Sequence, residues 1–180
     1  MAEPKVDAQV VTTLVVSSDV DVAAIAPSKP VGAALVVGGG IAGVQAALDL
    51  AGSGIKVYLL ERSPTIGGKM AQLDKTFPTN DCSMCIESPK FIECDRHPNI
   101  EILTYTEVDK LEGDAGDFTV TLTKKPRYIR EDRCPGCTTC VEYCPVEVPD
   151  PFNQDLSGNK AVHIYFSQAV PLIPYIDERC

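Results

Sequence analysis

The sequence has no excess of positive charge and no long hydrophobic run, and each absence argues against a class of function. Sixteen basic residues stand against twenty-five acidic ones, which gives a formal net charge of −9. A field of that sign repels nucleic-acid phosphates and anionic lipid headgroups, so neither is an expected partner. The longest stretch without charged or amide side chains, residues 31–44, contains three consecutive glycines. A membrane span needs roughly 20 apolar residues, so none is expected.

Two other absences narrow the function further. The N-terminal segment is acidic and lacks the basic start and unbroken apolar stretch of a secretory leader, so a cytoplasmic location is expected. No Ser/His/Asp arrangement and no paired-carboxylate site stands out, which argues against a hydrolase. The sequence does have eight cysteines, four of them within eleven residues. Without a leader, such clustered thiols indicate metal binding rather than disulfides.

A strand–helix–strand unit is predicted near the start of the chain. Residues 31–37 form a short apolar run that ends in glycines, which is typical of a strand buried on both faces of a parallel sheet. Residues 41–53 place apolar side chains three or four apart, as a helix does, and Gly54 is suited to end it. Residues 55–60 predict a second strand. Together these segments predict one βαβ unit.

Three glycines in the pattern G-x-G-x-x-G stand between the predicted strand and helix. Gly38 permits the tight turn, Gly40 lets the backbone approach a pyrophosphate, and Gly43 lets the helix pack against the strand. The helix N-terminus then offers free N–H groups to the phosphates. Glu61 ends the second strand and can accept hydrogen bonds from a ribose hydroxyl pair. A glycine-rich turn without a ligand is the alternative, but it does not explain why an acidic residue, Glu61, stands at the end of the second predicted strand.

The glycine turn alone does not distinguish FAD from NAD, but the residues after it favour FAD. The order Glu61, Arg62 and then the pair Gly67–Gly68 resembles the ADP-binding half of the two-dinucleotide flavoprotein superfamily. In that superfamily the glycine pair sits beside the flavin pyrophosphate and ribityl chain. The resemblance implies cofactor binding by Gly38, Gly40, Gly43, Glu61, Arg62, Gly68 and Lys69.

Regular structure is harder to predict in the remainder of the chain. Residues 63–98 contain four prolines and three cysteines, so we expect an ordered functional loop region there. Residues 102–105, 118–122 and 162–166 are expected to form strands, and residues 114–117 a turn.

A run of cysteines late in the chain has the spacing C-x2-C-x2-C-x3-C-P, which is that of bacterial ferredoxins. Gly136 lies between two of these cysteines, where a residue without Cβ lets the backbone curl around sulfide. A zinc site or plain buried thiols are the alternatives, but zinc sites more often pair two C-x-x-C units across a longer gap or use histidine. The predicted [4Fe–4S] ligands are Cys134, Cys137, Cys140 and Cys144.

The spacing does not determine which cysteine is the fourth ligand of this cluster. In two-cluster ferredoxins the fourth cysteine of a run serves the other cluster. Cys144 would then belong to a second cluster, and Cys180, the last residue, would be the first cysteine of a second run that has been cut off. Alternatively, Cys144 closes a single cluster and Cys180 is an unrelated thiol. We favour the truncated second run and count Cys180 as a candidate ligand.

A separate C-x-x-C motif precedes the ferredoxin run. Cys82 and Cys85 could be a redox dithiol, half of a metal site or two unrelated thiols, and we favour cluster ligation. Cys94 follows nine residues later without a clear role. His97 is followed by proline and is more consistent with a structural role.

Several strings resemble the A subunit of heterodisulfide reductase and its bacterial relatives. These strings are PTNDCSMC at residues 78–85, RHPNI at residues 96–100 and KPRY at residues 125–128, followed by the ferredoxin run. Their order and spacing agree over residues 31–180. Family members are several times longer, so this chain is expected to be a fragment, a split gene product or a truncated reading frame.

The resemblance implies an α/β fold. It implies an N-terminal arm (residues 1–30), a partial FAD-binding Rossmann-like domain of the thioredoxin-reductase type (residues 31–128), and an inserted, incomplete α+β ferredoxin-like module (residues 129–180). In the family, the segment that corresponds to Cys82 and Cys85 holds a further cluster near the flavin.

The resemblance also implies a function in electron transfer between FAD and [4Fe–4S] clusters, in some members by electron bifurcation. The implied partners are other subunits of a heterodisulfide-reductase-like complex and an electron donor of the ferredoxin, hydrogenase or dehydrogenase type. A non-catalytic fragment that binds partner subunits is one alternative. A flavin–ferredoxin enzyme of the glutamate synthase small-subunit type is another, against which the string at residues 81–86 argues.

Overall fold

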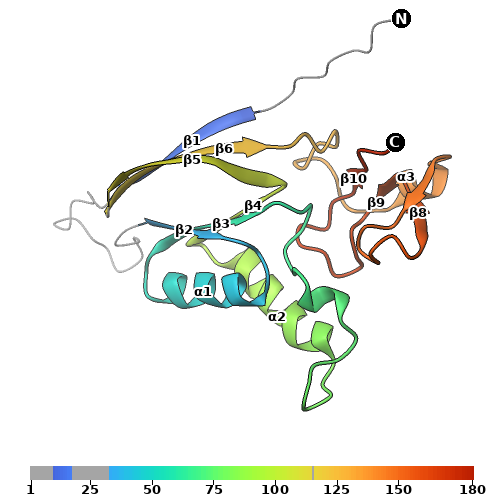
Figure 1. Cartoon of the computed structure of the whole chain (residues 1–180), viewed down its shortest axis with the longest axis horizontal. Coiled ribbons are helices and arrows are strands. Elements are labelled where there is room, and N and C mark those ends of the chain that lie inside the picture. The colour runs from blue at the N-terminus through green and yellow to red at the C-terminus, as the bar shows by residue number, and fades with distance from the viewer. Residues whose placement is uncertain (1–9, 18–32, 115) are drawn as a thin grey trace, which may run out of the picture.

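The computed structural model describes residues 10–17, 33–114 and 116–180 (Figure 1). Most of the expected N-terminal arm lies outside these residues. The part that is described, β1 (Val10–Ser17), pairs antiparallel with β6 (Asp117–Lys124). Residues 10–17 are therefore an integral strand of a sheet.

The predicted βαβ unit is confirmed. Strand β2 (Ala33–Val37), helix α1 (Ile41–Gly52) and strand β3 (Lys56–Glu61) follow one another, and β2 and β3 pair in parallel. Strand β4 (Ile100–Thr104) pairs in parallel with β3, which gives the sheet order β2-β3-β4. The apolar face of α1 packs on this sheet, since four residues of the helix are buried at helical spacing: Val44, Ala47, Leu48 and Ala51.

For residues 33–37, the part of the predicted strand that the structure describes, the prediction of burial on both faces is wrong. Strand β2 is only half-buried, and Val37 is 66% exposed. Among the described residues, β2 pairs only with β3 and forms the edge of the parallel sheet, so one flank has no neighbouring strand to cover it. The most buried strand of this sheet is the central one, β3, in which Val57 and Leu59 are inaccessible to solvent.

The expectation of an irregular loop over residues 63–98 is also wrong. The short 3₁₀ helix η2 (Met70–Gln72) and the helix α2 (Ser83–Arg96) lie within it. The helical period is hard to recognise in the sequence because Pro89 falls inside the helix and the buried face mixes polar with apolar side chains. The buried positions of α2 are Ser83, Glu87, Phe91 and Cys94.

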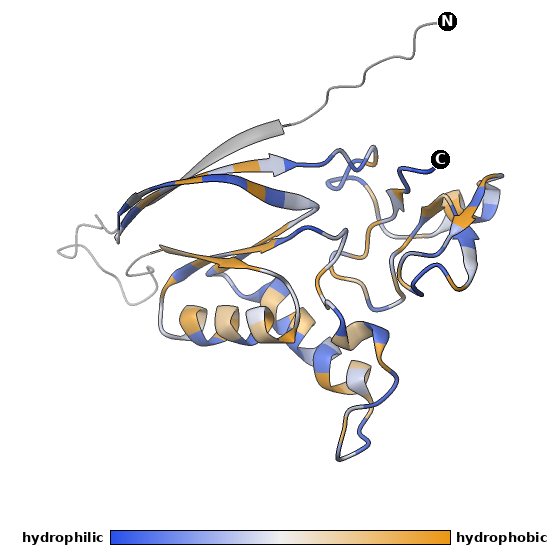
Figure 2. Cartoon of the chain, in the orientation of Figure 1, coloured by the Kyte–Doolittle hydropathy of each residue, from blue (hydrophilic) through white to orange (hydrophobic). Residues whose placement is uncertain are grey.

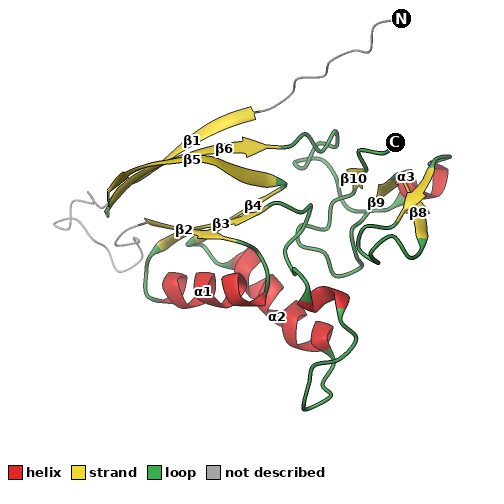
Figure 3. Cartoon of the chain, in the orientation of Figure 1, coloured by secondary structure: helices red, strands yellow, loops and turns green. Residues whose placement is uncertain are grey.

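Three layers position the candidate site. Helices α1 and α2 cover one face of the parallel sheet, and a second sheet covers the other (Figures 1 and 3). This second sheet has the order β1-β6-β5, and β5 (Thr106–Asp114) and β6 pair antiparallel as a hairpin. Hydrophobic residues concentrate on β2, β3 and α1, whereas β5 is largely hydrophilic (Figure 2). Leu60 of β3 packs with Val120 and Leu122 of β6 between the two sheets.

The expectations for the strand at residues 102–105 and the half-buried strand at residues 118–122 are confirmed by β4 and β6. The strand expected over residues 162–166 is shorter than predicted. Only β9 (Val162–His163) is a strand, because its partner β10 (Tyr175–Ile176) offers two residues for pairing. The chain then leaves the sheet, and Phe166 joins the main hydrophobic core.

The cysteine-rich end of the chain has little regular structure. Besides β9 and β10 it contains the short helix α3 (Thr139–Tyr143) and the hairpin β7 (Glu147–Pro149) and β8 (Gly158–Lys160). Across the described part of the chain, no helix has the length and apolarity that crossing a membrane requires.

Candidate functional site

The glycine turn has the geometry that a phosphate-binding turn requires. Gly38 has a positive φ of 109°, and its N–H donates to the carbonyl of Leu60 over 2.7 Å, which ties the turn to the end of β3. A Cβ on Gly43 would lie 1.8 Å from the Gly38 carbonyl oxygen, so α1 packs directly on the turn. This close approach is the packing role that the third glycine serves in dinucleotide-binding turns.

The N-terminus of α1 is free to meet an anion. Gly40 is the N-cap residue, and without a side chain it cannot cap the first-turn N–H groups. The first turn also contains no acidic residue. The helix dipole and the uncapped N–H groups therefore favour a negative group at this end.

A second glycine pair lies against the first turn. The N–H of Gly67 donates to the carbonyl of Gly39 over 2.8 Å. A Cβ on Gly68 would lie 2.9 Å from the Cα of Gly40, closer than real Cβ contacts. The structure thus brings together two glycine segments that are separated by a helix and a strand, which is the arrangement implied by the flavoprotein resemblance.

Glu61 connects the end of β3 to both neighbouring turns. Its carboxylate accepts a hydrogen bond from the Gly39 N–H over 2.6 Å. The other oxygen accepts from the N–H and the hydroxyl of Ser63, over 2.8 and 2.7 Å. The side chain is therefore fixed and almost fully buried, at 8% exposure. Its role toward a ribose stays a prediction.

These elements enclose a cavity of about 350 Å³. Gly38, Glu61, Arg62, Gly68 and Lys69 line it together with Ser63, Thr65, Ile66, Gln72, Tyr165 and Phe166. The predicted dinucleotide residues Gly38, Glu61, Arg62, Gly68 and Lys69 therefore share one cavity. No sequence pattern points to Tyr165 and Phe166, which come from the cysteine-rich end of the chain (residues 129–180, called the cysteine-rich module below). The glycine cradle, the uncapped helix N-terminus and the buried carboxylate fit a dinucleotide.

The four cysteines of the ferredoxin run are free thiols that lie before α3 (Cys134 and Cys137), within it (Cys140) and directly after it (Cys144). Cys134 and Cys144 are half-buried, and Cys137 and Cys140 are exposed. Gly136 has a positive φ of 71°, and a Cβ there would lie 2.6 Å from the carbonyl oxygen of Leu172. Glycine at this position therefore lets the cysteine loop lie directly on the segment around residue 172.

Hydrogen bonds prepare two of these thiols for ionisation. The Thr139 hydroxyl donates to Cys137 Sγ over 3.5 Å, which lowers the pKa of Cys137. A backbone hydrogen bond from Val162 in β9 lowers the pKa of Cys144. Because the thiolate is the form that binds metal, this donor set fits the chemistry of an iron–sulfur cluster.

The structure does not gather the cysteines into a closed metal site. In residues 10–17, 33–114 and 116–180, no three side chains of His, Cys, Asp or Glu lie close enough together to hold a metal ion. Cys180 is exposed, and its N–H donates to the carbonyl of Asp177 over 3.0 Å. The cluster ligation by the run and by Cys180 therefore stays a prediction from spacing.

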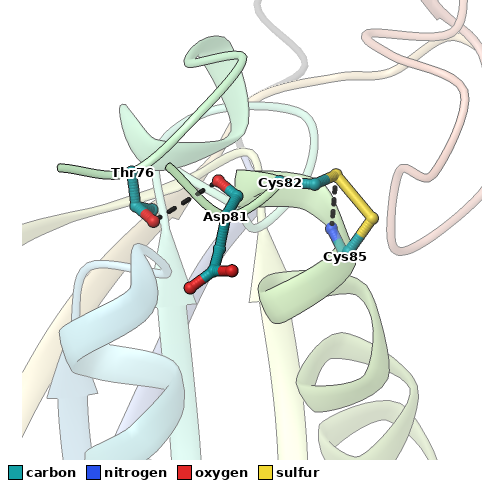
Figure 4. The surroundings of a disulfide bond; sticks show 4 residues. All are labelled: Thr76, Asp81, Cys82 and Cys85. Carbon is teal, nitrogen blue, oxygen red and sulfur yellow. Dashed lines mark hydrogen bonds between the residues drawn. A yellow bond between two sulfur atoms is a disulfide. The ribbon is translucent and has the colours of Figure 1, made fainter. Parts of the chain in front are cut away.

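Cys82 and Cys85 are joined as a disulfide at the start of α2 (Figure 4). Cys82 is the N-cap, and its sulfur accepts the Cys85 N–H over 3.2 Å. The preceding loop is held by Thr76, whose N–H donates to the Asp81 carbonyl over 2.8 Å. As a disulfide the pair has no thiolate to offer a metal, so ligation by these residues requires their reduction.

Cys94 and His97 lie at the other end of α2. Cys94 is completely buried and its thiol contacts the carbonyl of Val44, so burial raises its pKa to about 11. A thiol in that environment is inert toward metals. His97 follows the end of the helix, and its Nδ1 accepts the Asn99 N–H over 3.2 Å.

Two polar side chains of α2 lie buried without partners, and no sequence pattern singles them out. The hydroxyl of Ser83 and both carboxyl oxygens of Glu87 make no hydrogen bond. Burial raises the pKa of Glu87 to about 7. A buried carboxyl without donors is stable in its neutral form.

Comparison with known proteins agrees with the two parts of the site. Residues 34–83 match the family model of FAD dependent oxidoreductases, and residues 127–150 match the model of 4Fe-4S binding domains. The chain is thus an iron–sulfur flavoprotein, with FAD and [4Fe–4S] clusters as its cofactors.

Comparison with individual proteins identifies the relationship more specifically than the family models do. The chain is 56% identical, over 143 residues, to the first of two iron-sulfur A subunits of the CoB--CoM heterodisulfide reductase of Methanopyrus kandleri, with 79% of this chain and 21% of the relative covered. It is 56% identical, over 145 residues, to the A subunit of the H(2):CoB-CoM heterodisulfide,ferredoxin reductase of Methanothermobacter thermautotrophicus, with 81% and 22% covered. The chain is a relative of the heterodisulfide reductase A subunits and spans about a fifth of their length.

Among solved structures, the L-proline dehydrogenase from P. horikoshii aligns with a TM-score of 0.43 and 25% identity, over 50% of this chain and 19% of that protein.

Proposed function

We propose that this chain belongs to the electron-transfer machinery of a heterodisulfide-reductase-like complex. The observation that carries the proposal is the shared cavity wall: the dinucleotide cavity is lined both by the glycine turns and by Tyr165 and Phe166 of the cysteine-rich module. Electron transfer requires the flavin and the clusters to lie near each other. A module that contributes directly to the flavin cavity meets this requirement.

Different residues of the chain would bind the flavin and the clusters. The glycine segments and the α1 N-terminus hold the pyrophosphate, and Glu61 holds the adenosine ribose. When bound, FAD exchanges electrons in pairs and the clusters pass them singly, so together they convert between the two. Cys134, Cys137, Cys140, Cys144 and Cys180 supply thiolates to [4Fe–4S] clusters, and Cys82 and Cys85, once reduced, supply two more.

The proposed partners are other subunits of the complex and an electron donor of the ferredoxin, hydrogenase or dehydrogenase type. An exposed apolar loop before α2 supports docking on another protein. Phe77 in this loop is 98% exposed and Leu73 is 56% exposed. The same observation favours a second candidate, a non-catalytic fragment that only binds partner subunits.

Anaerobic cofactor analysis separates the two candidates. The protein is purified without oxygen, and iron, sulfide and flavin are counted per chain, followed by EPR spectroscopy after reduction. The electron-transfer proposal predicts bound flavin and a cluster signal that appears on reduction. A colourless protein without iron, even after reconstitution with iron, sulfide and FAD, would favour the partner-binding fragment.

A further inference from the structure

Two aromatic side chains reach the dinucleotide cavity from a distant part of the sequence. Tyr165 and Phe166 line the cavity beside Glu61. Phe166 is 9% exposed, and a Cβ on Gly67 would lie 3.2 Å from its ring. The second glycine pair therefore makes room for Phe166 as well as for the glycine turn. The module residues are part of the cavity wall and do not merely lie near it.

Tyr165 lines the cavity into which the adenosine of the dinucleotide is expected to bind. Burial raises the pKa of its phenol, and the carboxylates of Asp150 and Glu61 raise it further, while Arg62 acts in the opposite direction. Glu61, the predicted ribose-binding residue, and Arg62 line the same cavity as Tyr165. The neutral phenol there combines an apolar ring face with a hydroxyl that can donate a hydrogen bond.

An aromatic layer holds Tyr165 in place. The ring of Phe152 stacks on Phe166 at a centroid distance of 5.0 Å. Tyr165 meets Phe152 edge-on at 5.4 Å and lies 6.0 Å from the ring of Tyr175. Because several rings fix its position, Tyr165 is preorganised for a ligand and loses little freedom on binding.

The same layer continues toward the ferredoxin cysteines. The Tyr175 hydroxyl and His163 Nε2 are hydrogen-bonded over 2.8 Å, and both residues are buried. His163 belongs to β9, and β9 contacts α3, the helix that contains Cys140. A continuous set of contacts therefore joins the dinucleotide cavity to the cysteine run.

We propose that Tyr165 is a dinucleotide-binding residue that the cysteine-rich module contributes to the FAD cavity, so that FAD binding and the ordering of this module stabilise each other. That FAD is the ligand rests on the proposed function. That Tyr165 contacts the ligand is a separate claim, which the proposed function does not imply. Since coupling free energies are reciprocal, a nucleotide that contacts Tyr165 must stabilise the segment that carries it.

Titration calorimetry with FAD and with ADP tests the contact. Tyr165→Leu should weaken both affinities about three- to tenfold, because an aromatic contact is lost while the glycine turns are unchanged. Tyr165→Phe keeps the ring and should stay within about twofold of the wild type. Tyr128→Leu removes a tyrosine that is 62% exposed, lies outside the cavity and serves as the matched control.

Three outcomes can be told apart. If the wild type binds FAD and ADP but Tyr165→Leu binds them equally well, Tyr165 is not a binding residue and this inference is overturned alone. If the wild type binds neither nucleotide, the proposed function fails with it. A loss of affinity that is equally large in Tyr128→Leu would indicate a general effect on folding and would also count against the inference.

Hydrogen exchange of the wild type tests the coupling without any substitution. Addition of FAD should slow amide exchange in residues 161–176 as well as around the glycine turns. Protection confined to residues 33–72 would contradict the coupling, even if Tyr165 contributes to affinity.

Discussion

The guanidinium of Arg127 donates a hydrogen bond of 2.6 Å to the carbonyl oxygen of Pro64. Pro64 belongs to the loop between Glu61 and the second glycine pair, and Arg127 stands just before the cysteine-rich module. The same guanidinium donates to the Thr104 hydroxyl over 2.9 Å and to the Ile173 carbonyl over 3.3 Å. One buried side chain therefore joins the cofactor loop, the parallel sheet and the segment on which the cysteine loop packs.

Arg127→Met should destabilise the fold by about 3 kcal/mol. The substitution leaves the buried carbonyl of Pro64 and the half-buried carbonyl of Ile173 without these donors, and each unsatisfied buried group costs about 1–3 kcal/mol. Urea unfolding, monitored by circular dichroism, measures the change. Arg130→Met is the control, since the Arg130 side chain is exposed and, within the described part of the chain, pairs only with Asp132. Equal stability of Arg127→Met and Arg130→Met would show that Arg127 does not join these segments.

Gly43→Ala should abolish FAD binding, whereas Gly52→Ala should not. Both glycines lie in α1, but a Cβ at position 43 would lie 1.8 Å from the Gly38 oxygen, and a Cβ at position 52 meets nothing within 4 Å. Alanine at position 52 should raise helix stability by up to about 1 kcal/mol. FAD titration and thermal unfolding of both variants check the pair. Retained binding in Gly43→Ala would mean that the turn can move without loss of the site.

Glu87 should make stability depend on pH. Its pKa is raised by burial from 4.5 to about 7 in the folded protein. The folded state therefore holds a proton that the unfolded state has lost between these values. The stabilisation is complete below pH 4.5 and is lost as the pH rises toward 7, by at most about 3 kcal/mol.

Glu87→Gln should remove most of this dependence, because the amide does not titrate. Urea unfolding at several pH values between 4.5 and 7 gives the slope for the wild type and the variant. Parallel slopes for the two proteins would show that Glu87 is not the titrating group.

The double variant Cys82→Ser/Cys85→Ser tests whether this pair ligates a cluster. Under the proposed assignment, anaerobically reconstituted protein should lose part of its iron relative to the wild type, because two thiolates are missing. Cys94→Ser is the control, since the buried Cys94 thiol should hold no iron. Iron and sulfide counts give the answer. An unchanged iron content, with an oxidised Cys82–Cys85 pair in the wild type, would instead indicate a redox dithiol.

Local patterns are enough to predict the parallel sheet around the glycine turn. Each part of the βαβ unit carries its own signal, and Glu61 follows from the length of β3. Helix α2 escapes such a prediction because its buried face contains Ser83 and Glu87 and its middle contains Pro89. These residues mask the apolar period on which a sequence prediction depends.

The far wall of the cavity cannot be predicted for a different reason. Tyr165 and Phe166 reach the cavity only through tertiary packing, and no short-range pattern encodes such a contact. For the cysteines, the sequence gives more information about the site than the structure does. Their spacing predicts a cluster strongly, while the described residues form no closed metal site. The sequence is more informative here because ligand spacing follows the shape of the cluster itself.

The position of β2 at the border of its sheet has a consequence for handling the protein. Among the described residues its outer backbone groups have no strand partner, and Val37 is largely exposed. An unpaired edge strand of this kind pairs with further strands, either from a partner polypeptide or from other copies of the same chain during aggregation. Addition of a polypeptide that pairs with β2 should therefore improve the yield of dispersed material more than changes of buffer would.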